Sequence, residues 1–518
     1  MFNQNIKRAV LLLLLAKVVY AQDHANADTE QTIPAQLSLF DVVMMAQQND
    51  PWLHASQLQQ QATINKSVAA GTLPNSKISL QMMNLPVDSW QLEQEGMTQV
   101  KVGISQMFPR GDSLAIKEQQ LSIKANKFPL LRADRKAKLE TKVSELWLTA
   151  YLAQQTIRLI EDNETLFTQM AEVARANYSN VVGKTRQQDV IRAQLEIIQL
   201  QDRLTVEKQK FESALASLNE WLQPYDDNSK KQIKYFDSNF AFNQDEYYQP
   251  YTIAKLLPDL ELKKPSLLHN NHLSLNQLAN LIFAHPAILA LEVNSQASAK
   301  NIELAKQAYK GQWAINASYG YRDNMPSGQS RSDLFSLGIS YDLPLFSNKK
   351  QDQLLAAAIA NTEAIKTEKL LLTKQMVTAL EKELRQLKRL RERQSLYQDL
   401  LVKQTHQQAE ASLTAYTNDD GDFAEVVRAR IAELNTNISA LQIDVQLLKT
   451  ITRINYYFAK APQNEQNKAK SLVTEQYPFA QPGNDNHQDN LYQKSEQGHQ
   501  GQHKGQLVKT RQLETSYE

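Results

Sequence analysis

Residues 313–321 read Trp-Ala-Ile-Asn-Ala-Ser-Tyr-Gly-Tyr, and residues 335–343 read Phe-Ser-Leu-Gly-Ile-Ser-Tyr-Asp-Leu. In both stretches large apolar side chains alternate with small or polar ones, which is the pattern of a strand with two different faces. The loop between them contains Asn324, Pro326 and Gly328, residue types that favour turns. The two stretches therefore predict a hairpin of strands about ten residues long, the length at which a tilted strand crosses a bilayer.

The same alternation occurs in a weaker form in the first part of the chain. Its apolar positions are Ile78, Leu80 and Met82, followed by Val100, Val102 and Ile104. We therefore expect four strands, at about 76–84, 98–108, 312–322 and 333–343. Strands with one polar and one apolar face, and with aromatic residues near their ends, are typical of a transmembrane barrel. A soluble hairpin that covers a core fits the same pattern, so the strands alone leave both alternatives open.

Long runs with apolar residues at alternating spacings of three and four surround the strands, at 139–178, 190–221 and 427–448. This heptad pattern is typical of coiled coils, and the alanines in it let helices approach closely. Residues 130–180 as a single helix would be about 75 Å long, and Pro129 is expected to start or kink it. Two hairpins of this length cannot bury their apolar seams in one compact monomer. We therefore expect partner chains.

The chain consists of two halves with the same order of predicted elements. The matching landmarks, each pair 235 residues apart, are Pro51 and Pro286, Pro109 and Pro344, and Trp221 and Tyr456. Each half reads as a helix, a strand pair, a long helix, a turn and a second long helix. This internal self-similarity predicts a first repeat at 35–222 and a second at 273–458, with residues 223–272 as a linker or equatorial region between them.

The two ends of the chain differ in composition from the rest. Lys7 and Arg8 precede an apolar run from Ala9 to Leu15, and the segment ends in Val19-Tyr20-Ala21, with a small residue at Ala21. This layout predicts a signal peptide over residues 1–21 with cleavage after Ala21. A membrane anchor is the alternative, but the apolar run is short. Residues 463–518 are rich in Gln, Asn, Ser and Lys, and we expect them to form a disordered tail.

Composition excludes several classes of function. Lys and Arg number 57 and Asp and Glu 56, so the net charge of +1 gives no overall footprint for nucleic acid. Only 14 Gly and 16 Pro in 518 residues predict long, uninterrupted helices. With no Cys, disulfides, thiolate metal sites and cysteine nucleophiles are excluded. Since the sequence also lacks a catalytic triad or a phosphate-binding loop, we expect neither an enzyme nor a bound cofactor or metal.

Three kinds of motif carry a resemblance to a known family. Residues 37–51 form an opening helix that ends in Asn-Asp-Pro. Residues 106–111 (Gln-Met-Phe-Pro-Arg-Gly) and 341–346 (Tyr-Asp-Leu-Pro-Leu-Phe) end the strand pairs. Residues 176–183, followed by 189–194, join the end of one heptad run to the start of the next. Together, and in this order, they resemble the opening helix, strand exits and hairpin tip of the TolC-type outer-membrane efflux proteins.

The resemblance covers about residues 35–460 and implies a mainly α fold with a transmembrane β part. Each chain of a homotrimer would give four strands to one shared barrel in the outer membrane. The two internal repeats would also build a long α-helical coiled-coil barrel that extends into the periplasm. Such a chain would be exported to the cell outer membrane of a Gram-negative bacterium after its signal peptide is removed.

The same resemblance implies a function. The chain would be the passive exit duct of a tripartite efflux system, joined by a periplasmic membrane-fusion adaptor to a proton-driven inner-membrane pump. Residues 80–89, 97–99 and 103–114 most resemble the heavy-metal branch, whose ducts serve cobalt-zinc-cadmium or copper-silver pumps of the resistance-nodulation-division class. The implied partners are a second and third copy of the chain, the adaptor, the pump and outer-membrane lipid.

Gly183 and Gly421 are the glycines of the two predicted hairpin tips. In the family such tips contact the adaptor or the pump, so both glycines are candidate contact positions. The alternative is structural, because a glycine that follows a helix often adopts the left-handed conformation that ends it.

Charged residues follow both predicted tips. In the family, carboxylates at the positions of Asp189 and Glu425 line a constricted periplasmic aperture, and copies in a trimer would form a ring that attracts cations. Asp422 adds acidity at the second tip, while Arg428 occupies a position that is often acidic in the family. Helix capping is the alternative role, since a carboxylate in the first turn stabilises a helix by about 0.3–1 kcal/mol.

Alternative functions of the same class are efflux of drugs or other organic compounds and type I protein secretion. From a different class, the chain could be a periplasmic coiled-coil scaffold without a pore. Such a scaffold is expected to have one helical hairpin between small β domains, whereas this sequence predicts a strand pair in each of two halves. Fractionation separates the classes: a duct is an SDS-resistant trimer in the outer membrane, and a scaffold is a soluble periplasmic monomer.

Overall fold

The computed structural model describes residues 36–179, 187–222, 252–265, 274–344, 348–418 and 421–462. These ranges include all four strand segments expected from the sequence. The expected signal peptide at 1–21, the tail at 463–518, Gly183 and most of the linker at 223–272 lie outside the described residues.

The first half contains two short helices, a strand pair and long helices. In chain order they are β1 (Gln36–Leu37), α2 (Leu39–Asn49), α3 (Pro51–Ala70), β2 (Lys77–Met83), β3 (Gln99–Phe108), α4 (Ser113–Ala125), α5 (Lys127–Ser179) and α6 (Gln187–Leu222). Pro129 lies in the first turn of α5, where its missing N–H removes no helical hydrogen bond, so this proline starts the helix rather than kinking it. The 53 residues of α5 correspond to about 80 Å of helix.

The second half has a similar order. Its elements are β4 (Thr252–Ile253), α7 (Leu275–Ile282), α8 (Pro286–Gln307), β5 (Gln312–Tyr321), β6 (Leu334–Asp342), α9 (Asn348–Leu396), η3 (Tyr397–Leu401), α10 (Val402–Thr417) and α11 (Phe423–Tyr456). Two differences separate the halves. The break between α4 and α5 at Asn126 has no counterpart in α9, and the π-helical segment η3 between α9 and α10 has none in α5.

Equivalent caps start α3 and α8. Asp50 precedes Pro51, and its carboxylate accepts a hydrogen bond from Trp52 N at 3.1 Å. His285 precedes Pro286, and its Nδ1 accepts from Ala287 N at 3.2 Å. Each chain segment therefore turns into a new helix at an N-cap followed by a proline whose φ suits the first helical turn.

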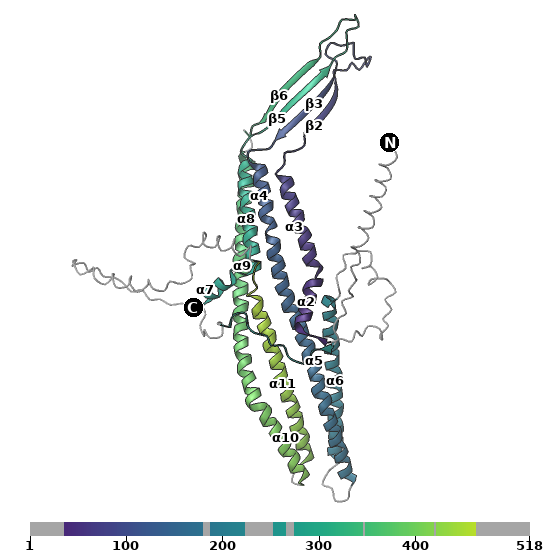
Figure 1. Ribbon diagram of the computed structural model, residues 1–518, viewed down its shortest axis with the longest axis vertical. Helices are drawn as coiled ribbons and strands as arrows, with labels where there is room; N and C mark the ends of the chain where they lie inside the picture. The colour runs from purple at the N-terminus through teal and green to yellow at the C-terminus, as the bar shows by residue number, and fades with distance from the viewer. Residues whose placement is uncertain are drawn as a thin grey trace, which may run out of the picture. The chain divides into compact units, whose positions relative to one another are not determined.

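The four longer strands form one antiparallel sheet in the order β2-β3-β5-β6, shown in Figure 1 joined to the ends of the helices. Strand β3 of the first half pairs with β5 of the second over nine residue pairs, from Val100–Tyr321 to Phe108–Trp313. The strands lie within two residues of the ranges expected from the sequence. Because the sheet joins both halves, the two hairpins do not each cover a core of their own half.

The register puts most of the large apolar side chains of the sheet on one face. Two cross-strand rows show this: Ile78, Ile104, Ala317 and Leu337, and Leu80, Val102, Tyr319 and Phe335. Many of these side chains are exposed, among them Ile78 at 78%, Leu337 at 68% and Ile339 at 75%. No helix of the described residues covers this apolar face. In the described chain this face is therefore left uncovered.

The helices pack through the heptad seams predicted from the sequence. Helix α5 lies along α6 and α11, and α11 also packs against α9 and α10. One buried cluster contains Trp147, Leu218, Leu380 and Ile454, and Trp147 Nε1 donates to Leu37 O at 2.9 Å. A second cluster lies nearer the hairpin tips and includes Ile160, Phe167, Leu200, Phe423 and Leu434.

Among the described residues no single helix has both the length and the apolar composition to cross a membrane. The pair α7 and α8, bent by 73° at its break, meets both criteria only when taken together.

Candidate functional sites in the sheet and at the hairpin tips

The tip between α10 and α11 is held by a close approach of backbone to backbone. A Cβ on Gly421 would lie 2.7 Å from Tyr416 N and 2.9 Å from Ala415 C, distances that a larger residue cannot accept without a shift. Helix α10 ends at Thr417 with Asn418 as its C-cap, and Gly421 has no positive φ. The interpretation of Gly421 as a left-handed helix cap is therefore wrong. This position needs a glycine because there is no room for a side chain, not because the backbone adopts an unusual conformation.

The charged candidates of this tip share the first turns of α11. Asp422 is the N-cap, and its carboxylate accepts from Ala424 N at 3.2 Å. Glu425 and Arg428 follow at intervals of three residues, so the three side chains lie near one another along the helix. All three are exposed, and Arg428 Nε donates to Ala424 O at 3.1 Å. The structure thus brings Asp422, Glu425 and Arg428 together on the surface of one hairpin.

Asp189, the candidate of the other tip, has a different environment. It lies in the first turn of α6 and is 5% exposed, in contrast to the exposed Glu425. A carboxylate in this position complements the positive end of the helix dipole. Gly183, the glycine predicted at this tip, lies outside the described residues. The two tips therefore present their acidic residues differently, and no group of three or more His, Cys, Asp or Glu among the described residues is arranged to hold a metal.

A charged network that was not predicted from the sequence locks α10 to α11. Arg430 donates to Glu410 at 2.6 Å and to Glu433 at 2.8 Å, and Glu433 also contacts His406 Nδ1 at 2.6 Å. The hydrogen bond from Arg430 lowers the pKa of Glu410 below its ordinary value. The three-residue spacing of Arg430 and Glu433 was a visible signal. The pairing with α10 depends on the register between the two helices, which a single sequence does not give.

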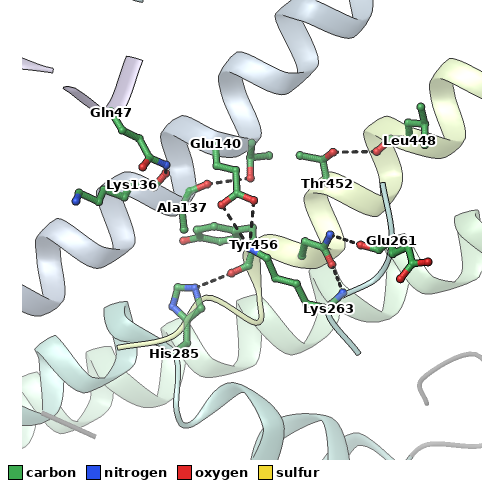
Figure 2. A network of polar contacts seen from close by, with 12 residues as sticks. Gln47, Lys136, Ala137, Glu140, Glu261, Lys263, His285, Leu448, Thr452 and Tyr456 are labelled. Carbon is green, nitrogen blue, oxygen red and sulfur yellow. Dashed lines mark hydrogen bonds and ion pairs between the residues drawn. The ribbon is translucent and has the colours of Figure 1, made fainter. Parts of the chain in front are cut away.

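A second network joins the segment 252–265 to α5 and α11 (Figure 2). Asn455 accepts from Lys263 N at 2.7 Å and donates to Glu261 O at 2.8 Å, and Lys263 Nζ lies 3.2 Å from Glu140. Below them His285 Nε2 lies 3.1 Å from the carbonyl oxygen of Tyr456. These contacts fix the segment across the helices, so their role is structural.

His285 is 1% exposed, and its two ring nitrogens have separate partners. Nδ1 accepts from the backbone N–H of Ala287, so Nε2 carries the proton and donates to Tyr456 O. Burial lowers the pKa of His285 below its ordinary 6.5, with Asp134 acting in the opposite direction. Tyr456 OH donates to Asp134 Oδ1 at 2.9 Å. Burial thus favours the neutral form of this imidazole.

The sheet has a polar face opposite the apolar one. Its cross-strand rows are Lys77, Ser105, Asn316 and Gly338; Ser79, Gly103, Ser318 and Ser336; and Gln81, Lys101, Gly320 and Leu334. A recess of about 400 Å³ opens at the end of this face nearer the helices, lined in part by Lys77, Ser105, Asn316 and Ser340. Such a face suits contact with water, while the apolar face suits contact with lipid.

An ion pair joins the two strand exits at that end of the sheet. Arg110, which follows β3, pairs with Asp342 at the end of β6, and its other nitrogen donates to Ala308 O at 2.9 Å. The exit motifs of the two halves are therefore tied to each other and to the segment after α8. Both residues belong to motifs identified in the sequence, but their contact was not predicted.

Comparison with known proteins identifies the fold. No family model matches the sequence, and no curated protein matches it. Among solved structures, the outer-membrane channel OprN matches with a TM-score of 0.62 at 13% identity, over 83% of this chain and 90% of that one. The outer-membrane channel CmeC of Campylobacter jejuni matches with a TM-score of 0.62 at 12% identity, over 84% and 88% of the two chains. CusC, whose structures concern transmembrane channel formation, matches with a TM-score of 0.60 at 13% identity, over 82% of this chain and 92% of that one. The chain has the fold of these outer-membrane channels.

Proposed function

We propose that this protein is the outer-membrane exit duct of a tripartite efflux system of the TolC type. The observation that carries the proposal is the four-stranded sheet with one exposed apolar face and one polar face, attached to long helices with coiled-coil seams. The similarity in fold to outer-membrane channels supports it. The duct catalyses no reaction and needs no cofactor, because its part in transport is to provide a path.

Incomplete strand pairing supports assembly as a homotrimer. Strands β2 and β6 form the two edges of the sheet, and each has one side without a strand partner in the described chain. Unpaired strand edges favour further pairing, and a closed barrel removes them. Three copies, each giving four strands, would close one barrel with its apolar face to lipid and its polar face to water. The two halves of similar element order are then repeats that share one barrel wall and one helical cylinder.

The length and charge of the helices support a proposal for where the other partners act. Helix α5 is about 80 Å long, too long for a lipid-embedded role with its many charged residues. We infer that the helices extend into the periplasm, and that the tips near Gly183 and Gly421 meet a periplasmic adaptor and an inner-membrane pump. The signal peptide expected at 1–21, cleaved after Ala21, would direct the chain to this location.

At the second tip, Asp422 and Glu425 are proposed to line a periplasmic aperture. Both are exposed, and copies in a trimer would form a ring of carboxylates that attracts cations. Arg428, one turn further on, reduces the net negative charge of this ring. Asp189 is buried in its own chain, so we give it the lesser part in an aperture and expect it to stabilise the start of α6.

The aperture proposal predicts a change in conductance. Replacing both acids, in Asp422→Ala with Glu425→Ala, is expected to raise single-channel conductance and reduce block by divalent cations, because the ring that binds them is lost. Planar bilayer recording of the purified protein measures both quantities. Recordings identical to those of the wild-type protein would show that these side chains do not line the aperture.

The proposed cargo is heavy-metal cations delivered by a resistance-nodulation-division pump, on the basis of the motifs at 80–89, 97–99 and 103–114. Export of drugs or other organic compounds through the same fold is the alternative. A deletion strain grown on zinc, cadmium, cobalt, nickel, copper and silver salts, with dyes and detergents alongside, tests the two. Loss of tolerance to one group of metals, restored by the intact gene, supports metal efflux; sensitivity to dyes and detergents alone contradicts it.

Membrane fractionation tests the duct itself. An SDS-resistant trimer in the outer-membrane fraction is expected. A soluble periplasmic monomer would contradict the duct and favour a coiled-coil scaffold.

A further inference from the structure

The polar face of the sheet carries an unbalanced positive charge. The four strands contain three ionisable residues with a full charge at neutral pH, Lys77, Lys101 and Asp342, and all three lie on this face. Asp342 is paired with Arg110, which holds the only carboxylate of these strands in a neutral pair. Neither lysine has an ion pair among the described residues. The net charge of the polar face therefore comes from Lys77 and Lys101.

The two lysines lie at different levels of the face. Lys77 is the first residue of β2, at the end nearer the helices, while Lys101 is near the start of β3, at the end nearer the loop of residues 84–98. The register pairs Lys77 with Ser105 and Lys101 with Gln81, so four residues of β2 separate the levels, or about 13 Å. The row between them, from Ser79 to Ser336, contains only serine and glycine.

The neighbours of Lys77 are groups that can accompany an anion. The recess beside it is lined by Ser105, Asn316 and Ser340, and also by Asp342, whose charge is paired with Arg110. Ser105 Oγ donates to Asn316 Oδ1 at 2.5 Å. Hydroxyl and amide groups donate hydrogen bonds, and lysine adds a positive charge with three donors. Lysine rings line anion-selective pores for the same reason.

We propose that Lys77 and Lys101 make the barrel wall of this duct prefer anions to cations, so that the wall resists the passive return of cations. The inference rests on the proposed function, in which the polar face lines the bore, and adds a specificity to it. Cations driven outward by a pump cross the wall at high local concentration. A cation outside meets the same charge without that drive, which suits an exporter of toxic cations.

Other charges act in series with the wall. The outer loops contain Asp88, Glu93, Glu95 and Asp323, and the hairpin tip contains Glu425. These carboxylates attract cations, so the overall selectivity of the pore combines their effect with that of the lysines in the wall. The contribution of the wall is measured by the difference between variants that change only its lysines.

The test uses the purified full-length protein in planar bilayers with a KCl gradient at low ionic strength. The reversal potential gives the permeability ratio of K⁺ to Cl⁻. Lys77→Gln with Lys101→Gln is compared with Lys77→Arg with Lys101→Arg, which keeps the charge at both positions. We expect the Gln variant to raise the ratio by roughly fourfold for each charge removed, because one charge about 10 Å from an ion in water changes the occupancy of K⁺ and of Cl⁻ by about twofold each, in opposite directions. The Arg variant is expected to match the wild type.

Three results overturn the inference, and they are distinguishable. Channels whose ratio is the same in the wild-type, Gln and Arg forms leave the duct intact and remove the role of the lysines. Equal shifts in the Gln and Arg variants show that side-chain shape rather than charge matters. An absence of any channel current from wild-type trimers removes the duct and the inference together. If the double Gln variant does not form a trimer, Lys101→Gln alone is measured against Lys101→Arg with the same criteria.

Discussion

At the scale of single residues, the buried His285 makes stability depend on pH. Because burial lowers its pKa in the folded chain, the unfolded chain binds a proton more readily below the ordinary pKa of 6.5. Stability is therefore fully present above pH 6.5 and is lost as the pH falls, by at most about 1.4 kcal/mol per pH unit, until the folded pKa is reached. Asp134, Lys138 and Tyr456 surround the imidazole and set where that limit lies.

The matched variant is His285→Asn, whose side-chain oxygen can keep the hydrogen bond from Ala287 N and so preserve the helix cap. We expect the thermal midpoint of the wild type to fall more steeply between pH 7 and pH 5 than that of the variant. Circular dichroism melts at half-unit intervals measure both slopes. Parallel slopes would show that another group governs the pH dependence.

Asp50 is the N-cap of α3, as His285 is of α8, and it also forms an ion pair. Its carboxylate is 2% exposed, caps Trp52 N and pairs with Arg135 at 2.8 Å, and Arg135 also lies over the rings of Trp52 and Trp221. Since the Arg135 side chain is 33% exposed, solvent weakens the pair. Asp50→Ala is expected to lower the free energy of unfolding by about 1–3 kcal/mol. Asp50→Asn keeps the cap and is expected to lower it by about half as much. Urea unfolding of both variants checks the order; equal losses would contradict a separate contribution from the cap.

At the scale of elements, the tip between α10 and α11 depends on the space at Gly421. In Gly421→Ala the new Cβ meets the backbone of Ala415 and Tyr416, which cannot move without breaking the end of α10. We expect faster hydrogen–deuterium exchange in residues 410–430 and little change in the sheet. Gly338→Ala is the matched control, because a Cβ there has nothing within 4 Å. Equal exchange at the tip in both variants would contradict the close packing at Gly421.

The elements differ in how far the sequence alone predicts them. Strands β5 and β6 were predictable because their alternation reports directly on two faces with different surroundings. The heptad seam placed the buried residues of α5 for the same reason. The π-helical segment at Tyr397–Leu401 and the break at Asn126 have no comparable signal, because each depends on how neighbouring helices pack. The charged residues near the tip were identified by their place in the chain. The left-handed cap that the sequence offered as the alternative role of Gly421 does not occur, because its φ is not positive.

Contacts between distant segments were the least predictable part of the candidate sites. The Arg110–Asp342 pair joins residues 232 positions apart, and the bond from Tyr456 to Asp134 spans 322. The residue types were visible, but their pairing follows from the strand order and from the register of α5 against α11. Lys101 of the polar face was more predictable, because strand alternation alone places it on the face opposite the apolar side chains.

At the scale of the whole molecule, the apolar face of the sheet decides between a membrane duct and a soluble scaffold. Leu337 and Ser336 are neighbours on β6, with side chains on opposite faces. An arginine on a lipid-facing strand position costs about 2–4 kcal/mol near the bilayer midplane, whereas a water-facing position tolerates it. A trimer places three copies of each substitution in one barrel, so the difference between the two positions is multiplied.

We therefore expect Leu337→Arg to reduce strongly the amount of SDS-resistant trimer in the outer-membrane fraction, and Ser336→Arg to leave most of it. Both variants add the same charge to the same strand, so expression, export and strand propensity are matched. Quantitative gels of the fractions, heated and unheated, give the yield of trimer. If both variants assemble equally well, the apolar face does not meet lipid. If Ser336→Arg alone fails, the two faces are reversed, and the lysines of the polar face then cannot line a bore.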